Sequence, residues 1–285
     1  MIADTCPGAA LPDAHIERVT EVGARRSLGP GAINREVIPP ADLPSSSPFI
    51  LLVEDFIAPQ DGLHEHPHRG LETVTLVLSG EMEHVDHLGD HGISVAGDVQ
   101  WMTAGRGIIH GGRPANGTNV HVLQLWLNLP SQQRHATPGT RHQQRAQARL
   151  ETSGGMTMRV YGEGPQQWSQ YPMTLRDIAS SDGGEMSVTL SAGRTFLYMV
   201  AGQATIGGRN TVAGEVIQLA VSSSQTAITI KAQAHSRIVA YSGQPIDEPV
   251  IVGGPFVAGS EAELRQAFAD LRDGKIVQPD ALRSL

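Results

Sequence analysis

A short sequence pattern occurs twice in the chain, and it constrains the fold more than any other feature. Residues 77–81 (VLSGE) and 95–99 (VAGDV) are echoed by residues 199–203 (MVAGQ) and 212–216 (VAGEV). Each piece joins apolar residues to a glycine turn, which is typical of a β-hairpin. Two copies of one hairpin predict two β-barrels of similar plan along the chain.

Short apolar or alternating segments fill both halves of the sequence, separated by Gly, Asn and Asp turns. Many short strands with evenly spaced turns indicate a β-sandwich or a barrel. A continuous apolar run at 49–53, bounded by the acidic pair at 54 and 55, predicts a strand that is buried on both faces. The other strands expected from these patterns are 16–19, 73–78, 80–86, 98–102, 120–127, 186–190 and 226–231.

The composition favours an intracellular globular protein. The 285 residues carry a formal net charge of −8, so a binding surface of clustered Lys and Arg for nucleic acid is not expected. Cys6 is the only cysteine, which excludes an intramolecular disulfide and a thiolate metal site. The first 11 residues lack the features of a signal peptide, and no apolar run approaches the roughly 18 residues that span a bilayer. We expect a cytoplasmic protein that contacts no membrane.

Histidines are concentrated in one part of the chain, because eight of the twelve lie between residues 63 and 122. His66 and His68 point the same way from an extended backbone, since side chains in a strand alternate faces. Two imidazoles on one face make half of a metal site, and His110 is the best candidate to complete it. A hairpin with an exposed tip is expected to leave three others mainly solvated: His84, His87 and His91.

Two longer segments resemble the pirin family of bicupins. Residues 66–75 (HPHRGLETVT) and 97–110 (GDVQWMTAGRGIIH) carry the likeness, which continues through 123–130 and 249–257 and is strongest between 49 and 130. The resemblance covers most of the chain. It implies an all-β fold of two tandem cupin barrels, each a double-stranded β-helix or jelly roll, with a short C-terminal helix.

The resemblance also implies one mononuclear divalent transition metal in the N-terminal barrel. The implied ligands are His66, His68 and His110. Imidazole donors suit Fe(II), which we expect first, and also Ni, Cu, Co, Mn or Zn. In the family a glutamate two residues after the third histidine completes the ligand set, whereas this chain has Gly112 at that position.

The glycine removes one oxygen ligand and one negative charge, and it leaves three arrangements open. Glu72 could supply the fourth ligand, three histidines could hold the metal and leave positions for water and substrate, or the site could hold no metal. We expect three histidines with Glu72 nearby. With no carboxylate at position 112, the remaining candidates for a catalytic base are Glu72, His64 and His121.

The family includes quercetin 2,3-dioxygenases, which cleave a flavonol with O2, and iron-bound partners of transcription factors. The resemblance therefore implies an oxidoreductase that acts on a small aromatic, flavonoid-like substrate. The alternative is a non-catalytic, redox-responsive regulator whose metal state changes the surface that a protein partner contacts, and an acidic chain suits a basic partner. A further alternative is a degenerate cupin with weak or no metal binding.

We expect four parts along the chain. Residues 1–135 would form the metal-binding barrel with an N-terminal arm, 136–150 a linker, and 151–245 a second barrel without metal ligands. Residues 246–285 would supply a strand and a helix that pack back on the barrels. Ser260 and Glu263 form a capping box at the start of this helix, and Gly274 marks its end.

Overall fold

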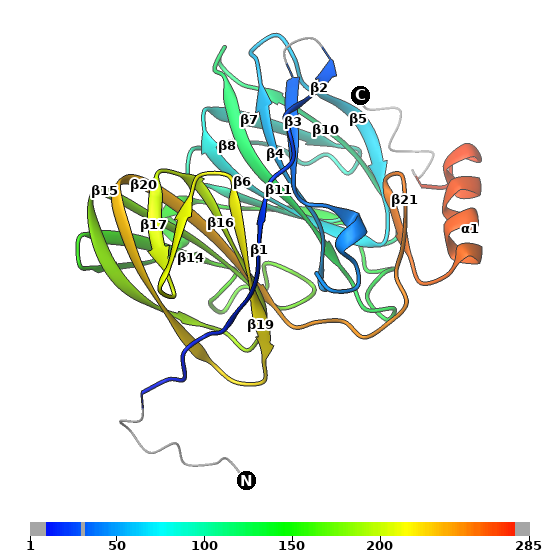
Figure 1. Cartoon of the computed structure of the whole chain (residues 1–285). Coiled ribbons are helices and arrows are strands. Elements are labelled where there is room, and N and C mark those ends of the chain that lie inside the picture. The colour runs from blue at the N-terminus through cyan, green and yellow to red at the C-terminus, as the bar shows by residue number, and fades with distance from the viewer. Residues whose placement is uncertain (1–9, 30–31, 277–285) are drawn as a thin grey trace. The chain divides into compact units, whose positions relative to one another are not determined.

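The computed structural model describes residues 10–29 and 32–276. Within these ranges the protein is almost entirely β-structure, with one α-helix and two short 3₁₀ turns, at Pro40–Asp42 and Arg145–Gln147 (Figure 1). The two-barrel all-β fold class predicted from the sequence is confirmed. Cys6 lies outside the described residues. None of the described helices is long and apolar enough to cross a membrane.

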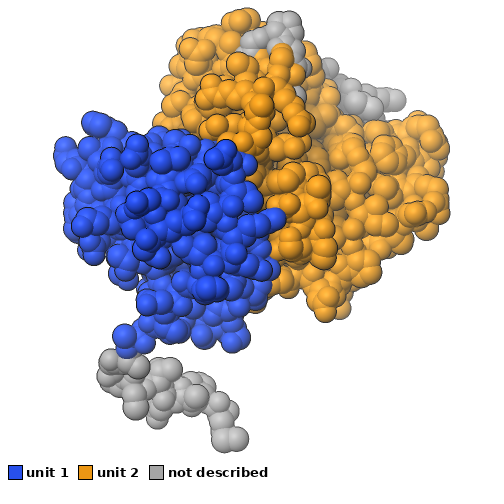
Figure 2. Space-filling model, in the orientation of Figure 1, with its two compact units in different colours: residues 1–21, 151–158, 175–243 blue, residues 22–150, 159–174, 244–285 orange. Residues whose placement is uncertain are grey.

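The described residues fall into two compact units, coloured separately in Figure 2. Unit 1 comprises the described residues up to 21 together with 151–158 and 175–243. Unit 2 comprises 22–150, 159–174 and 244 onwards, and it contains all the histidines of the expected site.

Unit 2 contains an antiparallel sheet in the order β12-β9-β6-β11-β4-β3-β2 and a second one in the order β5-β10-β7-β8. The strands of the larger sheet are β2 (Arg26–Gly29), β3 (Ala32–Ile38), β4 (Phe49–Ile57), β6 (Leu71–Ser79), β9 (Val99–Thr103), β11 (Val120–Asn128) and β12 (Gly139–Gln143). Those of the smaller sheet are β5 (Leu63–His68), β7 (Glu81–Asp86), β8 (His91–Val95) and β10 (Ile108–Pro114).

Most of unit 1 belongs to a nine-stranded sheet whose main order is β1-β19-β16-β20-β15-β14-β13, with β17 paired to β18 and β20. The strands of this sheet are β1 (Ile16–Glu21), β13 (Arg149–Ser153), β14 (Met156–Tyr161), β15 (Met173–Leu190), β16 (Gly193–Ala201), β17 (Gln203–Ile206), β18 (Arg209–Val212), β19 (Glu215–Ser222) and β20 (Thr226–Gly243). The strands β13, β14 and β15 also include residues of unit 2.

Two segments take part in strand pairing that the sequence did not suggest. β1, in the expected N-terminal arm, pairs antiparallel with β19 and so belongs to unit 1. β12, in the expected linker, pairs with β9 of unit 2. The other domain boundaries given above stay a prediction.

The repeated sequence pattern forms the same local structure in both units. In each copy the glycine of the second piece donates a backbone hydrogen bond to the first piece, and an acidic side chain caps the turn. These bonds are Gly97 N–H to Val77 O and Gly214 N–H to Met199 O, both 2.8 Å, and Val95 N–H to Asp98 Oδ2 (3.0 Å) and Val212 N–H to Glu215 Oε2 (2.7 Å).

The strand predicted at 49–53 is longer than the apolar run, because β4 continues through the acidic pair that was expected to end it. Glu54 is fully buried, where it accepts a hydrogen bond from Arg35 and another from His121 Nε2 at 2.7 Å. Asp55 is also buried and accepts a hydrogen bond from Asn34 Nδ2 at 2.6 Å. Partners on neighbouring strands therefore make two buried carboxylates compatible with a central strand.

The predicted C-terminal helix is present as α1 (Glu261–Arg272), which lies beside the hairpin of β21 (Ile251–Gly253) and β22 (Phe256–Ala258). Ser260 Oγ accepts the N–H of Glu263 at 3.2 Å, as the capping box predicts. Ala267 of the helix is buried in a cluster with Phe256 and Ile276.

Candidate metal centre

Three predicted ligands come together on two paired strands of unit 2. His66 and His68 lie on β5, and His110 lies on β10, directly opposite His66 in the antiparallel ladder. One ring nitrogen from each histidine lies within 4.8 Å of those of the other two. The ring centroids are 4.5 Å apart for His66 and His110, 4.8 Å for His66 and His68, and 5.2 Å for His68 and His110. We call these three residues the histidine cluster.

Backbone carbonyl groups orient two of these rings. His66 Nδ1 donates to the carbonyl of His64 at 2.7 Å, and His68 Nδ1 donates to that of Pro255 at 3.2 Å. A ring that donates from Nδ1 in its neutral form presents an unprotonated Nε2, the form that binds metals. The Nε2 atoms of His68 and His110 are buried without a hydrogen-bond partner.

Burial keeps the imidazoles of His68 and His110 neutral. Burial, with a smaller contribution from the adjacent His66, lowers the pKa of His68 to about 3. Burial also places the pKa of His110 well below its ordinary value, with smaller contributions from the neighbouring histidines. Neutral, buried and unpartnered nitrogens that face one another fit a divalent transition metal, because such an ion accepts their lone pairs.

Glu72 is not part of the cluster. Glu72 pairs with Thr103 of β9 in the ladder. The next residue of β6, Thr73, pairs with Trp126 of β11. The Trp126 ring contacts the ring of His68 at a centroid distance of 4.9 Å. Consecutive residues of a strand face opposite sides, so Glu72 faces away from Trp126.

The Glu72 carboxylate is held by three donors instead. Thr103 Oγ1 donates to it at 2.5 Å, the backbone N–H of Gln170 at 2.9 Å, and the Ser169 hydroxyl donates to its second oxygen. Burial raises the pKa of Glu72, although these hydrogen bonds lower it. Its role as a fourth ligand or base stays a prediction, and its contacts are those of a buried anchor for residues 169 and 170.

The other two predicted bases lie apart from the histidine cluster. His121 bonds Glu54 and stacks on Phe56 at a centroid distance of 4.2 Å. Because 121 and 126 are an odd number of positions apart on β11, the His121 side chain faces away from Trp126. His64 is exposed, and it lines a surface groove of about 450 Å³ together with Gln60, Asp61, Gly62, Leu63, Glu65, Glu83, Val85, Gly111, Gly112 and Arg113.

Gly112 follows the cluster on β10, where it pairs with His84 of β7. A Cβ atom at this position would lie 2.7 Å from Met82 Cε and 3.0 Å from the Glu83 carbonyl oxygen. The absence of a side chain therefore lets β7 and β10 pack closely beside the cluster.

The expectation that the histidines near the hairpin are solvated was wrong for two of the three. His84 is 3% exposed and His87 is 8% exposed, while His91 is exposed. His84 lies on the buried face of β7, and His87 Nδ1 accepts the backbone N–H of Ile109 at 3.0 Å. The signal in the sequence was the alternation of His84 and Asp86, which places both side chains on one face of a strand.

Comparison with known proteins identifies the family. The Pirin family model matches residues 27–127, and the model of the Pirin C-terminal cupin domain matches residues 175–277. The chain belongs to the pirin family. A candidate quercetin 2,3-dioxygenase of Pseudomonas aeruginosa is 36% identical to it over 80% of this chain and 86% of the relative.

Solved structures of pirins and quercetin dioxygenases share the fold. The crystal structure of a quercetin 2,3-dioxygenase from Acinetobacter baumannii matches with a TM-score of 0.81 at 26% identity, over 93% of this chain and 98% of that one. A bacterial pirin from Escherichia coli, solved in complex with nickel(II), matches with a TM-score of 0.63 at 21% identity, over 80% of this chain and all of that one. This pirin is therefore a bicupin that has quercetin dioxygenase-like relatives and residue clusters suited to a metal.

Proposed function

We propose that the protein is a metal-dependent dioxygenase that cleaves quercetin-like flavonols with O2, with His66, His68 and His110 as its metal ligands. The observation that carries the proposal is the meeting of three imidazole nitrogens within 4.8 Å, two of which are buried and have no partner. The resemblance to proteins named as quercetin dioxygenases supports the substrate class.

The chain supplies neutral ligands that are fixed before a metal binds. The carbonyl groups of His64 and Pro255 set the tautomer and the direction of two rings, and Trp126 packs against His68. When bound, a divalent ion supplies Lewis acidity to an acidic hydroxyl group of the substrate. We expect Fe(II) to be the active ion, and a Ni, Cu, Co, Mn or Zn ion also suits three imidazoles.

The absence of a carboxylate from the histidine cluster has a consequence for the substrate. Three neutral ligands leave the full charge of a dication in the pocket, whereas a glutamate would have offset part of it. An anionic group is therefore favoured there, and a flavonol ionised at one hydroxyl is such a group. With Glu72 held by three donors, we propose that the ligand set consists of the three histidines alone.

Oxygen consumption with quercetin tests this proposal. Protein reconstituted with Fe(II) should consume O2 when quercetin is added, and His68→Ala and His110→Ala should not. The matched control is His91→Ala, which removes an exposed histidine that pairs with Glu83 outside the cluster and should leave turnover unchanged. Stoichiometric metal without O2 uptake would reject the enzyme for this substrate and favour the metal-dependent regulator. Failure of the reconstituted protein to hold any metal would reject both functions.

A further inference from the structure

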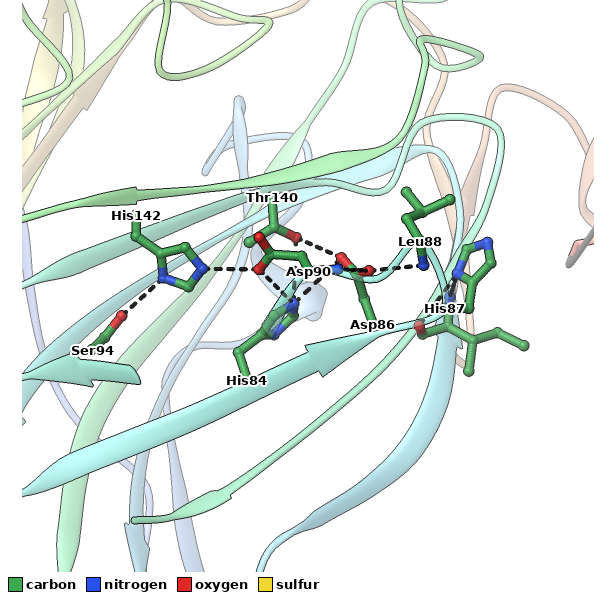
Figure 3. A network of polar contacts seen from close by, with 9 residues as sticks. His84, Asp86, His87, Leu88, Asp90, Ser94, Thr140 and His142 are labelled. Atoms are coloured by element: carbon green, nitrogen blue, oxygen red, sulfur yellow. Dashed lines mark hydrogen bonds and ion pairs between the residues drawn. The ribbon is translucent and has the colours of Figure 1, made fainter. Parts of the chain in front are cut away.

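We propose that the same barrel contains a second divalent-cation site, formed by His84, Asp86 and Asp90. One ligand atom of each lies within 4.8 Å of those of the other two. Figure 3 shows the three side chains turned toward one another, with Thr140 and His142 beside them. This set is distinct from the histidine cluster, although the rings of His84 and His110 are only 5.4 Å apart.

The spacing of the atoms suits a shared ion better than direct hydrogen bonds. His84 Nε2 lies 3.5 Å from Asp86 Oδ2 and 3.8 Å from Asp90 Oδ2. Both distances exceed the usual range of about 2.7–3.2 Å for an N–H···O bond. Two atoms bonded to one ion at about 2.0–2.2 Å lie at most about 4.4 Å apart, so both distances are compatible with a shared ion.

The charges in the cluster also call for a cation. Asp86 is 4% exposed and Asp90 is partly buried. Within residues 10–29 and 32–276, their ion-pair partners are histidines, and no Lys or Arg nitrogen pairs with either carboxylate. A buried carboxylate that stays ionised is stabilised by a positive ion.

A surrounding set of hydrogen bonds fixes the proposed ligands. Asp86 Oδ1 accepts the N–H groups of Leu88 (2.8 Å) and Asp90 (3.0 Å), which leaves Oδ2 directed at His84. The Thr140 hydroxyl donates to Asp86 Oδ2 at 3.0 Å, and its oxygen lies 3.3 Å from His84 Nε2. Outer contacts of this kind orient ligands in metal sites.

Asp90 is oriented in the same manner. Its Oδ2 atom accepts His142 Nε2–H at 2.9 Å, and the other ring nitrogen of His142 lies 3.2 Å from Ser94 Oγ. These contacts come from β8 and β12, so three strands and a loop converge on the proposed site (Figure 3).

The ligand types indicate the class of ion. One imidazole and two carboxylates form a harder donor set than three imidazoles, and carboxylate oxygens suit Mn(II). We therefore expect the second site to bind Mn(II) with both carboxylates ionised, which would balance the charge of the dication.

Equilibrium dialysis of the metal-stripped full-length chain against Mn(II), followed by elemental analysis, tests the second site. The wild type should bind two ions per chain, and His68→Ala should keep one. Asp86→Asn, which retains the oxygen that accepts the two N–H groups, should lower the affinity of one site at least tenfold and leave the other unchanged. Asp90→Asn should do the same, and it serves as the second variant if Asp86→Asn does not fold.

The matched control is His91→Ala. His91 follows Asp90 in sequence but pairs with Glu83, so this variant should still bind two ions. Wild-type binding that Asp86→Asn and Asp90→Asn leave unchanged would show that the cluster is a hydrogen-bond network only. A single ion that is lost in both His68→Ala and Asp86→Asn would show one centre completed by His84, and this would also overturn the second site. Ion counts do not depend on dioxygenase activity, so a failure of the proposed function remains distinguishable.

Discussion

Replacing Asp55 by asparagine should make unit 2 more stable at neutral pH. Asp55 lies on β4 and is 4% exposed. Burial, with a smaller contribution from the adjacent Glu54, raises the pKa of Asp55 to about 6. The hydrogen bond from Asn34 and the charge of His121 oppose this rise. The folded protein therefore binds this proton more tightly than the unfolded chain does.

The sign of the pH dependence follows from that difference. The stabilisation from protonated Asp55 is complete below its ordinary pKa of 3.8 and is lost as the pH rises through about 6. A shift of this size corresponds to about 3 kcal/mol of unfolding free energy lost by neutral pH. Asparagine does not ionise, and its side-chain oxygen still accepts from Asn34. We expect Asp55→Asn to be more stable than the wild type by up to about 3 kcal/mol at pH 7.5 and equally stable at pH 4.

Urea unfolding followed by tryptophan fluorescence measures this effect where it occurs, because all three tryptophans (Trp101, Trp126 and Trp168) belong to unit 2. Both proteins should be measured without metal between pH 4 and pH 8. Asp182→Asn, which changes an exposed aspartate, is the control and should follow the wild type at every pH. If Asp55→Asn is less stable than the wild type by the same amount at pH 4 and pH 7.5, the reasoning from burial is wrong.

Three further perturbations test other contacts. Gly112→Glu places an oxygen ligand beside the histidine cluster, and Met82→Ala is combined with it to remove the side-chain atom nearest to the new Cβ. The double variant should bind Ni(II) at least tenfold more tightly than the wild type in equilibrium dialysis. Unchanged or weaker binding would show that position 112 does not face the site. Ser169→Ala removes a hydrogen-bond donor from the buried Glu72 carboxylate. It should lower the free energy of unfolding, measured in urea, by about 1–3 kcal/mol. An unchanged urea midpoint would mean that water replaces the hydroxyl. Removing metal with a chelator should lower the thermal midpoint of the wild type. The same treatment should lower the midpoint of His110→Ala by a smaller amount. Equal shifts in the two proteins would exclude His110 as a ligand.

Local patterns were sufficient to predict most of the fold. Alternating and apolar segments predicted the central strands, the capping box at Ser260 predicted where α1 begins, and the repeated hairpin predicted two similar units. The sequence could not show that β4 continues through Glu54 and Asp55, because their burial depends on partners supplied by distant strands. Strand β12 was missed for the same reason, since its pairing with β9 is a long-range contact.

The histidine cluster was predictable because its residues follow simple rules of spacing. His66 and His68 share a face of one strand, and His110 follows a glycine-rich turn. The direction of Glu72 was not predictable, because it depends on the register between β6 and β11, which no local pattern specifies. His84 and Asp86 have the same alternation as His66 and His68, but only the packing of β7 on β10 shows that they are buried.

Anomalous X-ray diffraction from crystals loaded with Ni(II) tests the central claim most directly, because it locates the ion without reference to any activity. The account predicts an anomalous peak about 2.0–2.1 Å from one ring nitrogen each of His66, His68 and His110. That peak should be absent from crystals of His110→Ala prepared in the same way. A fully loaded crystal with no peak among these three histidines would contradict the account.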